Sequence, residues 1–110
     1  MADKLLVIVS TGEKAKALAG IAYAANALKQ RWLGDVKVGF FGPSEALIAQ
    51  DADVQRAAAA LPEDASPFAC KFIADQAGVT NQLASLGLDV HYVGETISRY
   101  IKEGYLPMVF

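Results

Sequence analysis

The amino-acid sequence predicts an α/β fold of three layers, in which helices cover both faces of a mostly parallel sheet of five strands. Two features of the chain lead to this prediction. Short, continuous apolar runs rich in valine and isoleucine are typical of strands that are covered on both faces. Between these runs lie segments whose apolar residues recur at helical spacing. A chain of 110 residues, 54 % of them hydrophobic, has room for one core, so we expect a single domain over residues 1–110.

The first expected strand is Lys4–Ser10, and a polar turn follows it. Ser10 and Glu13 have the spacing of a capping box, which predicts that Ser10 caps a helix continuing to Leu33. Gly34 is the expected C-terminal stop of this helix. The apolar residues that recur at helical spacing within it are Leu18, Ile21, Ala25, Leu28 and Trp32.

The second expected strand covers residues 35–41. Ser44 is a good N-cap for a helix over residues 45–50, and Asp53 for another over residues 54–60. The sequence therefore predicts two short helices between the second and third strands.

The segment that follows allows two interpretations. The first is a very short strand near residues 67–69, followed by a helix over about 71–77. The second is one continuous helix capped by Ser66, with Pro67 in its first turn. In both interpretations Cys70 lies close to a helix N-terminus.

The last third of the chain predicts a short helix over residues 81–86, a strand over 88–93, a helix from about 95 to 103 and a final strand over 106–110. Pro107 has no backbone N–H to donate to a neighbouring strand. We therefore expect it at the start of that strand or on an exposed edge of the sheet.

Right-handed connections between parallel strands bring every strand-to-helix turn to one edge of the sheet, where ligands bind in such folds. At Ser10–Gly12, backbone N–H groups could hold an anion, although simple helix capping is the favoured explanation. Glu95 is also explained more simply, as a carboxylate that stabilises a helix start. The candidate residues at this edge are Ser10, Thr11, Gly12, Ser44, Cys70, Lys71, Gly94 and Glu95.

Cys70 is the candidate nucleophile. A thiol at a helix N-terminus lies in the positive end of the helix dipole, which favours the thiolate, and the ammonium of Lys71 would give electrostatic support. The alternative is a buried cysteine that serves as a small apolar residue, and the position alone leaves the two equally open. His91, in mid-strand, is interpreted as a hydrogen-bonded core or interface residue rather than a catalyst.

The composition argues against several classes of function. With a net charge of −2 and scattered Lys and Arg residues, the chain lacks the clustered basic surface that nucleic-acid binding requires. No apolar segment reaches the roughly 20 residues of a membrane helix. A single cysteine excludes an internal disulfide and favours a cytoplasmic protein. One Cys and one His cannot build a structural zinc site, so we expect no metal and no cofactor.

Four short features together suggest a family. They are the opening strand and long helix of residues 4–33, the cysteine in Pro67-Phe68-Ala69-Cys70-Lys71, the strand and turn Val90-His91-Tyr92-Val93-Gly94-Glu95, and the close Ile101-Lys102-Glu103-Gly104-Tyr105 with its final strand. In these features the chain resembles the DsrE/DsrF-like family, which includes sulfur-relay proteins. The resemblance spans essentially the whole chain and implies a small three-layer α/β domain that assembles as a trimer or hexamer.

The resemblance also implies a function, in which Cys70 accepts a sulfane sulfur as a persulfide and passes it on. The protein would then be a sulfur carrier of the sulfurtransferase type rather than a metabolic enzyme, with a donor and an acceptor protein as partners. One alternative is a binding module for a phosphate-bearing molecule, such as a nucleotide or coenzyme A, at Thr11, Gly12, Ser44 and Gly94. Another is a subunit that serves only in assembly.

A homo-oligomer is expected on physical grounds as well. More than half of the chain is hydrophobic, yet a domain of this size has little interior. Aromatic residues are favoured in interface cores. The large residues that could supply such an interface are Phe72, Tyr92, Tyr100, Tyr105 and Phe110.

Overall fold

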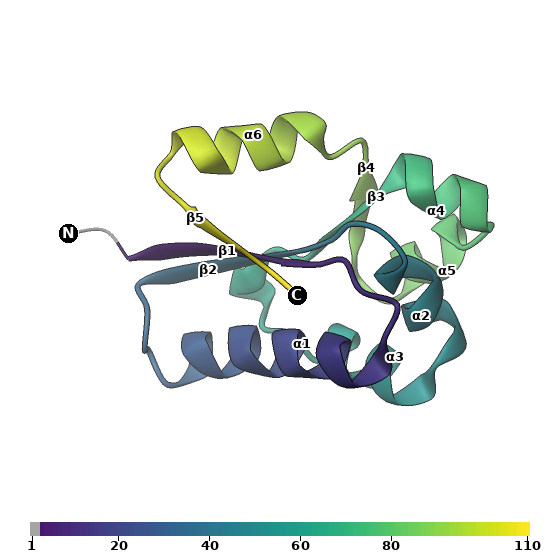
Figure 1. The fold of residues 1–110 in the computed structure, drawn as a ribbon, viewed down its shortest axis with the longest axis horizontal. Helices are drawn as coiled ribbons and strands as arrows, with labels where there is room; N and C mark the ends of the chain where they lie inside the picture. The colour runs from purple at the N-terminus through teal and green to yellow at the C-terminus, as the bar shows by residue number, and fades with distance from the viewer. Residues whose placement is uncertain (1–2) are drawn as a thin grey trace.

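The central feature of the structure, a computed structural model that describes residues 3–110, is a sheet of five parallel strands (Figure 1). Their order across the sheet is β4-β3-β2-β1-β5. The strands are β1 (Lys4–Val9), β2 (Asp35–Phe40), β3 (Phe68–Cys70), β4 (Asp89–His91) and β5 (Leu106–Val109). The predicted three-layer α/β class is confirmed, and every strand pair is parallel.

The helices cover the two faces of the sheet unequally. In Figure 1, α1 and α3 lie below the sheet and α6 lies above it, while α2, α4 and α5 gather near the carboxyl ends of the strands. The helices are α1 (Lys14–Lys29), α2 (Ser44–Gln50), α3 (Ala52–Ala59), α4 (Lys71–Ala77), α5 (Thr80–Ser85) and α6 (Gly94–Lys102), with a 3₁₀ turn, η1 (Glu63–Ala65).

Strand β1 is buried on both faces, which explains its continuous apolar sequence. Leu5, Val7 and Val9 belong to the larger core on the α1 side, whereas Leu6 and Ile8 belong to a smaller core under α6. The alternation follows from the two-residue period of a strand. Two-sided burial therefore requires apolar residues at every position from Leu5 to Val9.

The smaller core is built around aromatic rings. Tyr100 and Tyr105 meet edge to face with their centroids 4.8 Å apart, and the ring of Phe68 lies beside Tyr100. Phe68 also lies directly over Gly39 of β2, where a Cβ atom would come within 2.3 Å of the ring. The absence of a side chain at Gly39 thus makes the space that Phe68 fills.

Helix α1 differs from the prediction at both ends. It begins at Lys14, so Ser10 lies too far upstream to cap it, and the N–H of Glu13 donates instead to Oγ1 of Thr11, 3.0 Å away. It ends at Lys29 rather than Leu33, because Arg31 adopts a left-handed conformation with φ of 55°. Trp32, expected on the buried stripe, is therefore exposed.

The caps of the next two helices also differ from the prediction. Helix α2 begins at Ser44 itself, and the hydroxyl of Ser44 donates to the carbonyl of Val9 instead of capping the helix. Helix α3 is capped by Asp51, which accepts from the N–H groups of Asp53 and Val54. Asp53 thus lies inside the first turn that it was expected to cap.

The ambiguous segment adopts the first of its two interpretations, because strand β3 is followed at once by α4. The two strands of the last third are shorter than expected, at 89–91 and 106–109. The prediction for Pro107 is confirmed, since β5 is an edge strand. The N–H of Phe110 donates to Ile8 of β1, and alternate residues of a strand bond to the same neighbour. The backbone of Pro107 is therefore directed to the open edge.

Phe110 also joins three parts of the fold. Its carbonyl oxygen accepts from the N–H groups of Ser10 and Thr11, at 2.8 and 3.2 Å. Its ring packs against Gly20 of α1, where a Cβ atom would lie 2.8 Å from the ring. Phe110 thereby ties the end of β5 to the β1–α1 turn and to α1.

The large residues that were considered for an interface divide into two groups. Tyr100 and Tyr105 are buried under α6, and Phe110 is half-buried against α1. Phe72 and Tyr92 remain exposed, at 58 % and 65 %. A further exposed apolar surface is formed by the four residues of β5, which were not among the large residues considered for an interface.

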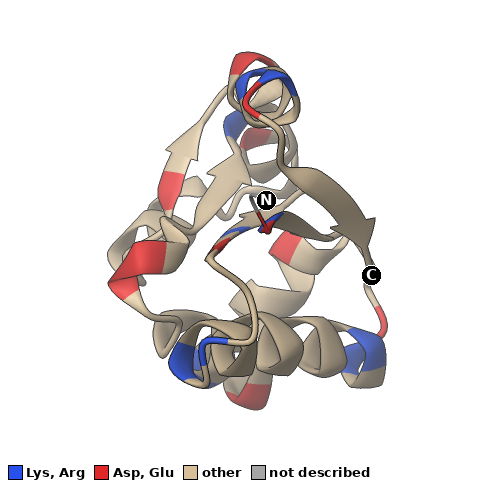
Figure 2. Cartoon of the chain, turned by 90° about the vertical axis from the view of Figure 1, so that its left-hand side faces the viewer, with Lys and Arg blue, Asp and Glu red and all other residues tan. Residues whose placement is uncertain are grey.

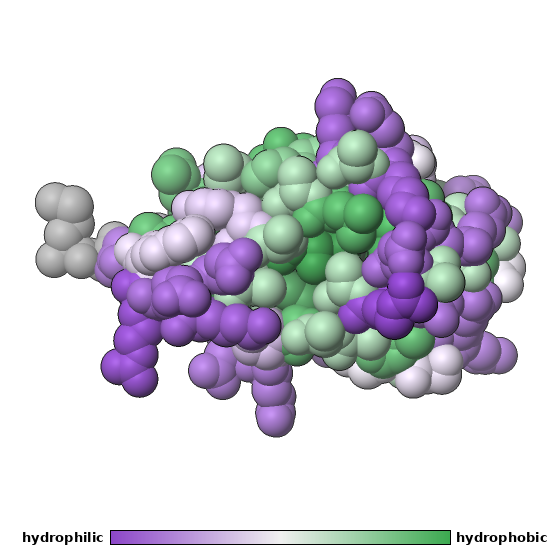
Figure 3. Space-filling view, turned by 90° about the horizontal axis from the view of Figure 1, so that it is seen from below, coloured by the Kyte–Doolittle hydropathy of each residue, from purple (hydrophilic) through white to green (hydrophobic). Residues whose placement is uncertain are grey.

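The surface carries charges of both signs. Figure 2 shows blue and red segments together on the helix at the top, α6, and scattered segments of both colours elsewhere. Seen from below, the face on the α1 side has apolar residues along its middle, with hydrophilic residues to either side (Figure 3). None of the helices in residues 3–110 combines the length and the apolar character that crossing a membrane requires.

Candidate functional site

The polar groups at the ends of β1 and β2 bond mainly to one another. The buried hydroxyl of Ser44 donates to the carbonyl oxygen of Val9 at 2.5 Å, and the N–H of Ser44 donates to the carbonyl oxygen of Ser10 at 3.0 Å. The hydroxyl oxygen of Thr11 accepts from the backbone two residues later. These contacts hold the two turns side by side and use the hydroxyls that were considered for phosphate binding.

Gly94 and Glu95 begin α6, as expected, and both are exposed. They line a shallow hollow of about 310 Å³ along that helix, together with Ser98, Arg99 and Lys102. All of these residues belong to α6, so the sheet edge contributes nothing to this hollow.

Cys70 is the last residue of β3 and the residue that immediately precedes α4. Its thiol is free, and its side chain packs on the α6 side of the sheet with Phe68 and Val93. Only 6 % of the residue is exposed. The predicted position at a helix start is confirmed, and the structure adds that the thiol lies almost entirely below the surface.

Lys71 does not direct its charge at the sulfur. Its Nζ atom lies 2.7 Å from Oδ2 of Asp75, one helical turn later, and over the ring of Tyr92 at 5.7 Å from the centroid. The hydrogen bond with Asp75 raises the pKa of Lys71. The ammonium is therefore paired within α4, which differs from the electrostatic support expected for Cys70.

His91 is the neighbour of Cys70 on the adjacent strand. The parallel register of β3 and β4 places Cys70 opposite His91 as Cα partners, on strands about 4.8 Å apart. Both side chains lie on the α6 face, since the rings of Phe68 and His91 are 6.0 Å apart. The structure thus brings together an imidazole and the thiol, a pairing that the sequence interpretation missed.

The imidazole of His91 has further polar neighbours. Its Nε2 atom lies 2.6 Å from Oγ1 of Thr96 in α6, and its Nδ1 atom lies 3.2 Å from Oδ1 of Asp89. The contact with Asp89 is close enough for an ion pair but lacks hydrogen-bond geometry, so Nδ1 is buried without a hydrogen-bond partner among residues 3–110. Nε2 is therefore held by Thr96, whereas Nδ1 lies beside Asp89 without a hydrogen bond.

Glu45 is another ionisable group close to Cys70, since the backbone N–H of Cys70 acts on its carboxyl group. It lies in the first turn of α2 and is fully buried. Its Oε2 atom accepts from the N–H of Gly42 at 3.4 Å, while Oε1 has no hydrogen-bond partner among residues 3–110. Burial raises the pKa of this carboxyl from 4.5 to about 7, against the opposing effect of the N–H groups of Gly42 and Cys70. The sequence interpretation gave Glu45 no role beyond membership of a helix.

Two hollows lie on the surface near α2, α4 and α6, and His91 lines one of them. A groove of about 470 Å³ lies between α2 and α4, and it is lined by Gly42, Pro43, Ala46, Ile73, Gln76 and Ala77. A second hollow, of about 390 Å³, lies under α6, and it is lined by Ser66, Phe68, Asp89, His91, Thr96, Arg99 and Tyr100. The hollow under α6 thus reaches His91, whereas neither hollow is lined by Cys70 or Glu45.

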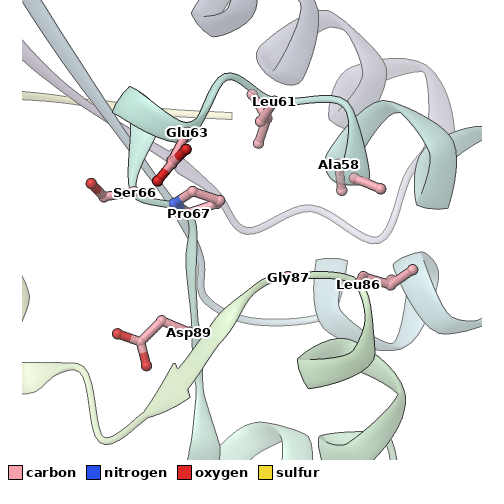
Figure 4. Close-up of a pocket in the computed structure, with 9 residues that line it drawn as sticks. Ala58, Leu61, Glu63, Ser66, Pro67, Leu86, Gly87 and Asp89 are labelled. Atoms are coloured by element: carbon pink, nitrogen blue, oxygen red, sulfur yellow. The ribbon is translucent and has the colours of Figure 1, made fainter.

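A cavity of about 490 Å³ lies instead at the amino ends of β3 and β4 (Figure 4). Leu61 and Ala58 lie on one side of it and Gly87 and Leu86 on the other, with Glu63 at one end. Its lining comes from the end of α3, from η1 and from the segments that lead into β3 and β4. Cys70 and His91 lie at the opposite ends of these strands, and neither lines this cavity, although Ser66 and Asp89 line both it and the hollow under α6.

Within residues 3–110, no group of three or more His, Cys, Asp or Glu residues is arranged to hold a metal ion. The candidate site consists of three side chains: those of Cys70 and His91, the last residues of β3 and β4, and that of Glu45, in the first turn of the helix after β2.

No protein-family model matches this chain, and no curated protein matches its sequence. Among solved structures, the chain is similar to BT1422, a conserved protein of unknown function from Bacteroides thetaiotaomicron. The two chains align with a TM-score of 0.89 and 25 % sequence identity, over 98 % of this chain and 95 % of that chain. The complete three-layer arrangement is thus found in another protein.

Proposed function

We propose that this protein is a sulfur carrier in which Cys70 holds a sulfane sulfur as a persulfide. The observation that carries the proposal is the pairing of Cys70 with His91 across β3 and β4. An imidazole beside a thiol favours the thiolate, which is the nucleophile in sulfur exchange. In this proposal the imidazole of His91 stabilises the sulfur anion, and its buried Nδ1 has no hydrogen-bond partner among residues 3–110.

The proposed reaction is a sulfur exchange without net oxidation. The thiolate of Cys70 attacks the outer sulfur of a donor persulfide, R–S–SH. A new S–S bond to Cys70 forms as the donor S–S bond breaks, and the donor leaves as a thiolate that takes up the proton lost by Cys70. The products are Cys70–S–SH and R–SH. An acceptor thiolate then removes the outer sulfur by the same exchange.

The small exposed fraction of Cys70 means that a protein donor reaches the sulfur only when the first turn of α4 opens. That helix has seven residues and no side-chain cap at its N-terminus. Its lysine forms an ion pair with an aspartate of the same helix, and its contact with a neighbouring segment is limited to the exposed ring of Tyr92. A short, uncapped segment of this kind opens at a lower free-energy cost than the whole domain.

The exposed aromatic residues of the same sheet edge suit a docking surface for such partners. Phe41 follows β2, Phe72 follows β3 and Tyr92 follows β4, and all three are exposed. Aromatic residues are enriched where proteins bind one another. The resemblance to the DsrE/DsrF-like family supports the same proposal, with Cys70 at the position of the sulfur-carrying cysteine.

Incubation with a persulfidated donor is expected to add the mass of one sulfur atom to the protein, as measured by intact mass spectrometry. Cys70→Ser removes the only thiol and should abolish the gain completely. His91→Gln keeps the thiol and should slow the gain by about 100-fold, the lower end of the effect of a positioned acid–base group. If the wild-type and Cys70→Ser proteins show the same mass after incubation, the carrier proposal is wrong.

We also propose that the protein associates with copies of itself, as a trimer or a hexamer. Strand β5 exposes Leu106 and Val109 at 67 % and 66 %, and Ile101 of α6 is exposed as well. Pro107 leaves the open edge of β5 short of a donor, so the contact should use side chains rather than an extension of the sheet. Light scattering at micromolar concentration should give a multiple of 11.7 kDa, and Leu106→Lys should lower it. A constant mass of one chain would contradict the proposal.

A further inference from the structure

The cavity at the amino ends of β3 and β4 and the hollow under α6 form one continuous groove, the edge groove, beside the edge strand β4. Ser66 and Asp89 line both hollows, so the two meet at these residues. Their volumes, about 490 and 390 Å³, are near the lower end of the range for small-molecule sites. Cys70 lines neither hollow, so the edge groove is separate from the thiol.

One end of the edge groove is apolar. Leu61 and Ala58 lie on one side of it and Leu86 on the other (Figure 4). An aliphatic group between these side chains would lose contact with water, which is favourable in proportion to the apolar area removed. This end therefore suits the hydrocarbon part of a ligand.

The middle of the edge groove carries two carboxylates. Glu63, Ser66 and Asp89 lie toward the end of the cavity that is opposite Ala58 and Leu86 (Figure 4). Oδ1 of Asp89 lies 3.2 Å from Nδ1 of His91 but forms no hydrogen bond with it. The carboxylate of Asp89 can therefore accept hydrogen bonds from a ligand, and a cation is favoured at this point.

The hollow under α6 contributes the opposite charge. Its His91 and Thr96 are paired with each other, with Nε2 and Oγ1 2.6 Å apart. Arg99 is the one Lys or Arg residue among those that line the edge groove in the described part of the chain. Its Cζ atom lies 5.2 Å from the centroid of the Tyr100 ring, and its Nε atom is 3.7 Å from Oε2 of Glu103, beyond hydrogen-bond distance. The guanidinium is therefore available to a carboxylate, which it can bind through two parallel hydrogen bonds.

These three parts of the edge groove lie in a definite order. Arg99 lines only the hollow under α6, and Leu61 and Leu86 line only the cavity, while Asp89 lies where the two meet. A complementary ligand presents a carboxylate, an ammonium group and an apolar group in the same order. An α-amino acid with an aliphatic side chain carries these three groups on a single carbon atom.

Other small molecules match fewer of these groups. A nucleotide or other phosphate ester would bring further negative charge to Asp89 and Glu63, with one arginine to offset it. An amine without a carboxylate would leave Arg99 unused. A fatty acid would present a carboxylate to the groove with no ammonium for Asp89.

We propose that the edge groove binds a free α-amino acid with an aliphatic side chain. Arg99 holds the carboxylate, and Asp89 and Glu63 hold the ammonium group. The aliphatic side chain lies between Leu61 and Leu86.

Titration with L-leucine, followed through the amide NMR signals of the protein, tests the proposal. We expect saturable shifts concentrated at residues 61–66, 86–89 and 96–99, with a dissociation constant of about 0.1 to 1 mM, as suits a ligand of few atoms. The absence of saturable shifts at these residues up to roughly 10 mM leucine would overturn the proposal. Shifts confined to another surface would overturn it as well.

Two analogues of leucine separate the contributions of its charged groups. Isoamylamine lacks the carboxylate, and isocaproate lacks the ammonium group. Each should bind the wild-type protein about tenfold more weakly than leucine, because each loses hydrogen bonds between charged groups. Equal dissociation constants for the three compounds would mean that apolar contact alone drives binding, which would overturn the proposal.

Arg99→Gln should weaken leucine binding about tenfold and leave the binding of isoamylamine unchanged, since the amine has no group for Arg99. Asp89→Asn should weaken the binding of leucine and isoamylamine but not that of isocaproate. Arg56→Gln is the matched control, because Arg56 is an exposed helical arginine that lines neither hollow. Equal effects of Arg99→Gln and Arg56→Gln on leucine binding would overturn the proposal. The analogue series uses the wild-type protein, so it decides the question even if a variant does not fold.

Discussion

Replacing Gly39 by alanine is expected to lower the free energy of unfolding by about 3 kcal/mol, at the upper end of the usual effect of overpacking a core. The new Cβ atom would lie 2.3 and 2.4 Å from ring atoms of Phe68, which is itself almost fully buried. Since Phe68 packs against Tyr100 and His91, the ring cannot move without disturbing the smaller core. Chemical denaturation should show the loss as a lower midpoint with an unchanged slope.

Gly94→Ala is the matched control for this experiment. It makes the same substitution where no atom lies within 4 Å of the new Cβ and where the backbone φ is not positive. Its effect on stability should stay within about 0.5 kcal/mol, as is usual for surface substitutions. Equal midpoints for Gly39→Ala and Gly94→Ala would contradict the packing described here for Phe68.

Glu45→Gln is expected to raise the stability of the protein at alkaline pH relative to the wild type. The folded protein holds the proton of Glu45 up to a pH of about 7, whereas the ordinary value for this group is 4.5. The contribution of the protonated Glu45 carboxyl to the free energy of unfolding is complete below pH 4.5. It is lost as the pH rises through 7. One pKa unit corresponds to about 1.4 kcal/mol, so the loss is on the order of 3 kcal/mol.

The measurement is the difference in unfolding free energy between Glu45→Gln and the wild type at several pH values. Between pH 4.5 and pH 8, the free energy of unfolding of the glutamine variant should rise relative to that of the wild type by about 3 kcal/mol. Groups common to both proteins, among them Asp51 and Asp53, cancel in this difference. A difference that does not vary with pH would mean that Glu45 titrates normally in the folded chain.

The fold could be predicted because its strongest determinants are local. Strand β1 is apolar at successive positions since both of its faces are covered, and this pattern is visible in Leu5–Val9 alone. The position of Cys70 at a helix start also follows from the turn residues before it. The helix caps were less predictable. The hydroxyl of Ser44 bonds to Val9, 35 residues away, and no local pattern distinguishes this use from capping.

The candidate site was predicted only in part, because two of its three side chains depend on strand order and register. Cys70 and His91 are neighbours because β4 pairs with β3, and because each is the last residue of its strand. Aligning the expected strand ends would have suggested the pair. The importance of Glu45 depends on its burial against another strand-to-helix turn, which its place in the sequence does not reveal.

The contacts of Phe110 bear on the binding-module alternative. A turn between a strand and a helix, with small polar residues and backbone N–H groups, has the features of a phosphate cradle. In this protein the N–H groups of Ser10 and Thr11 already donate to the carbonyl oxygen of Phe110. An oxygen of the chain itself thus occupies the position that a phosphate oxygen would take. A phosphate could bind there only by displacing the end of β5, so nucleotide binding at this turn would be accompanied by release of the Phe110 ring from Gly20 of α1.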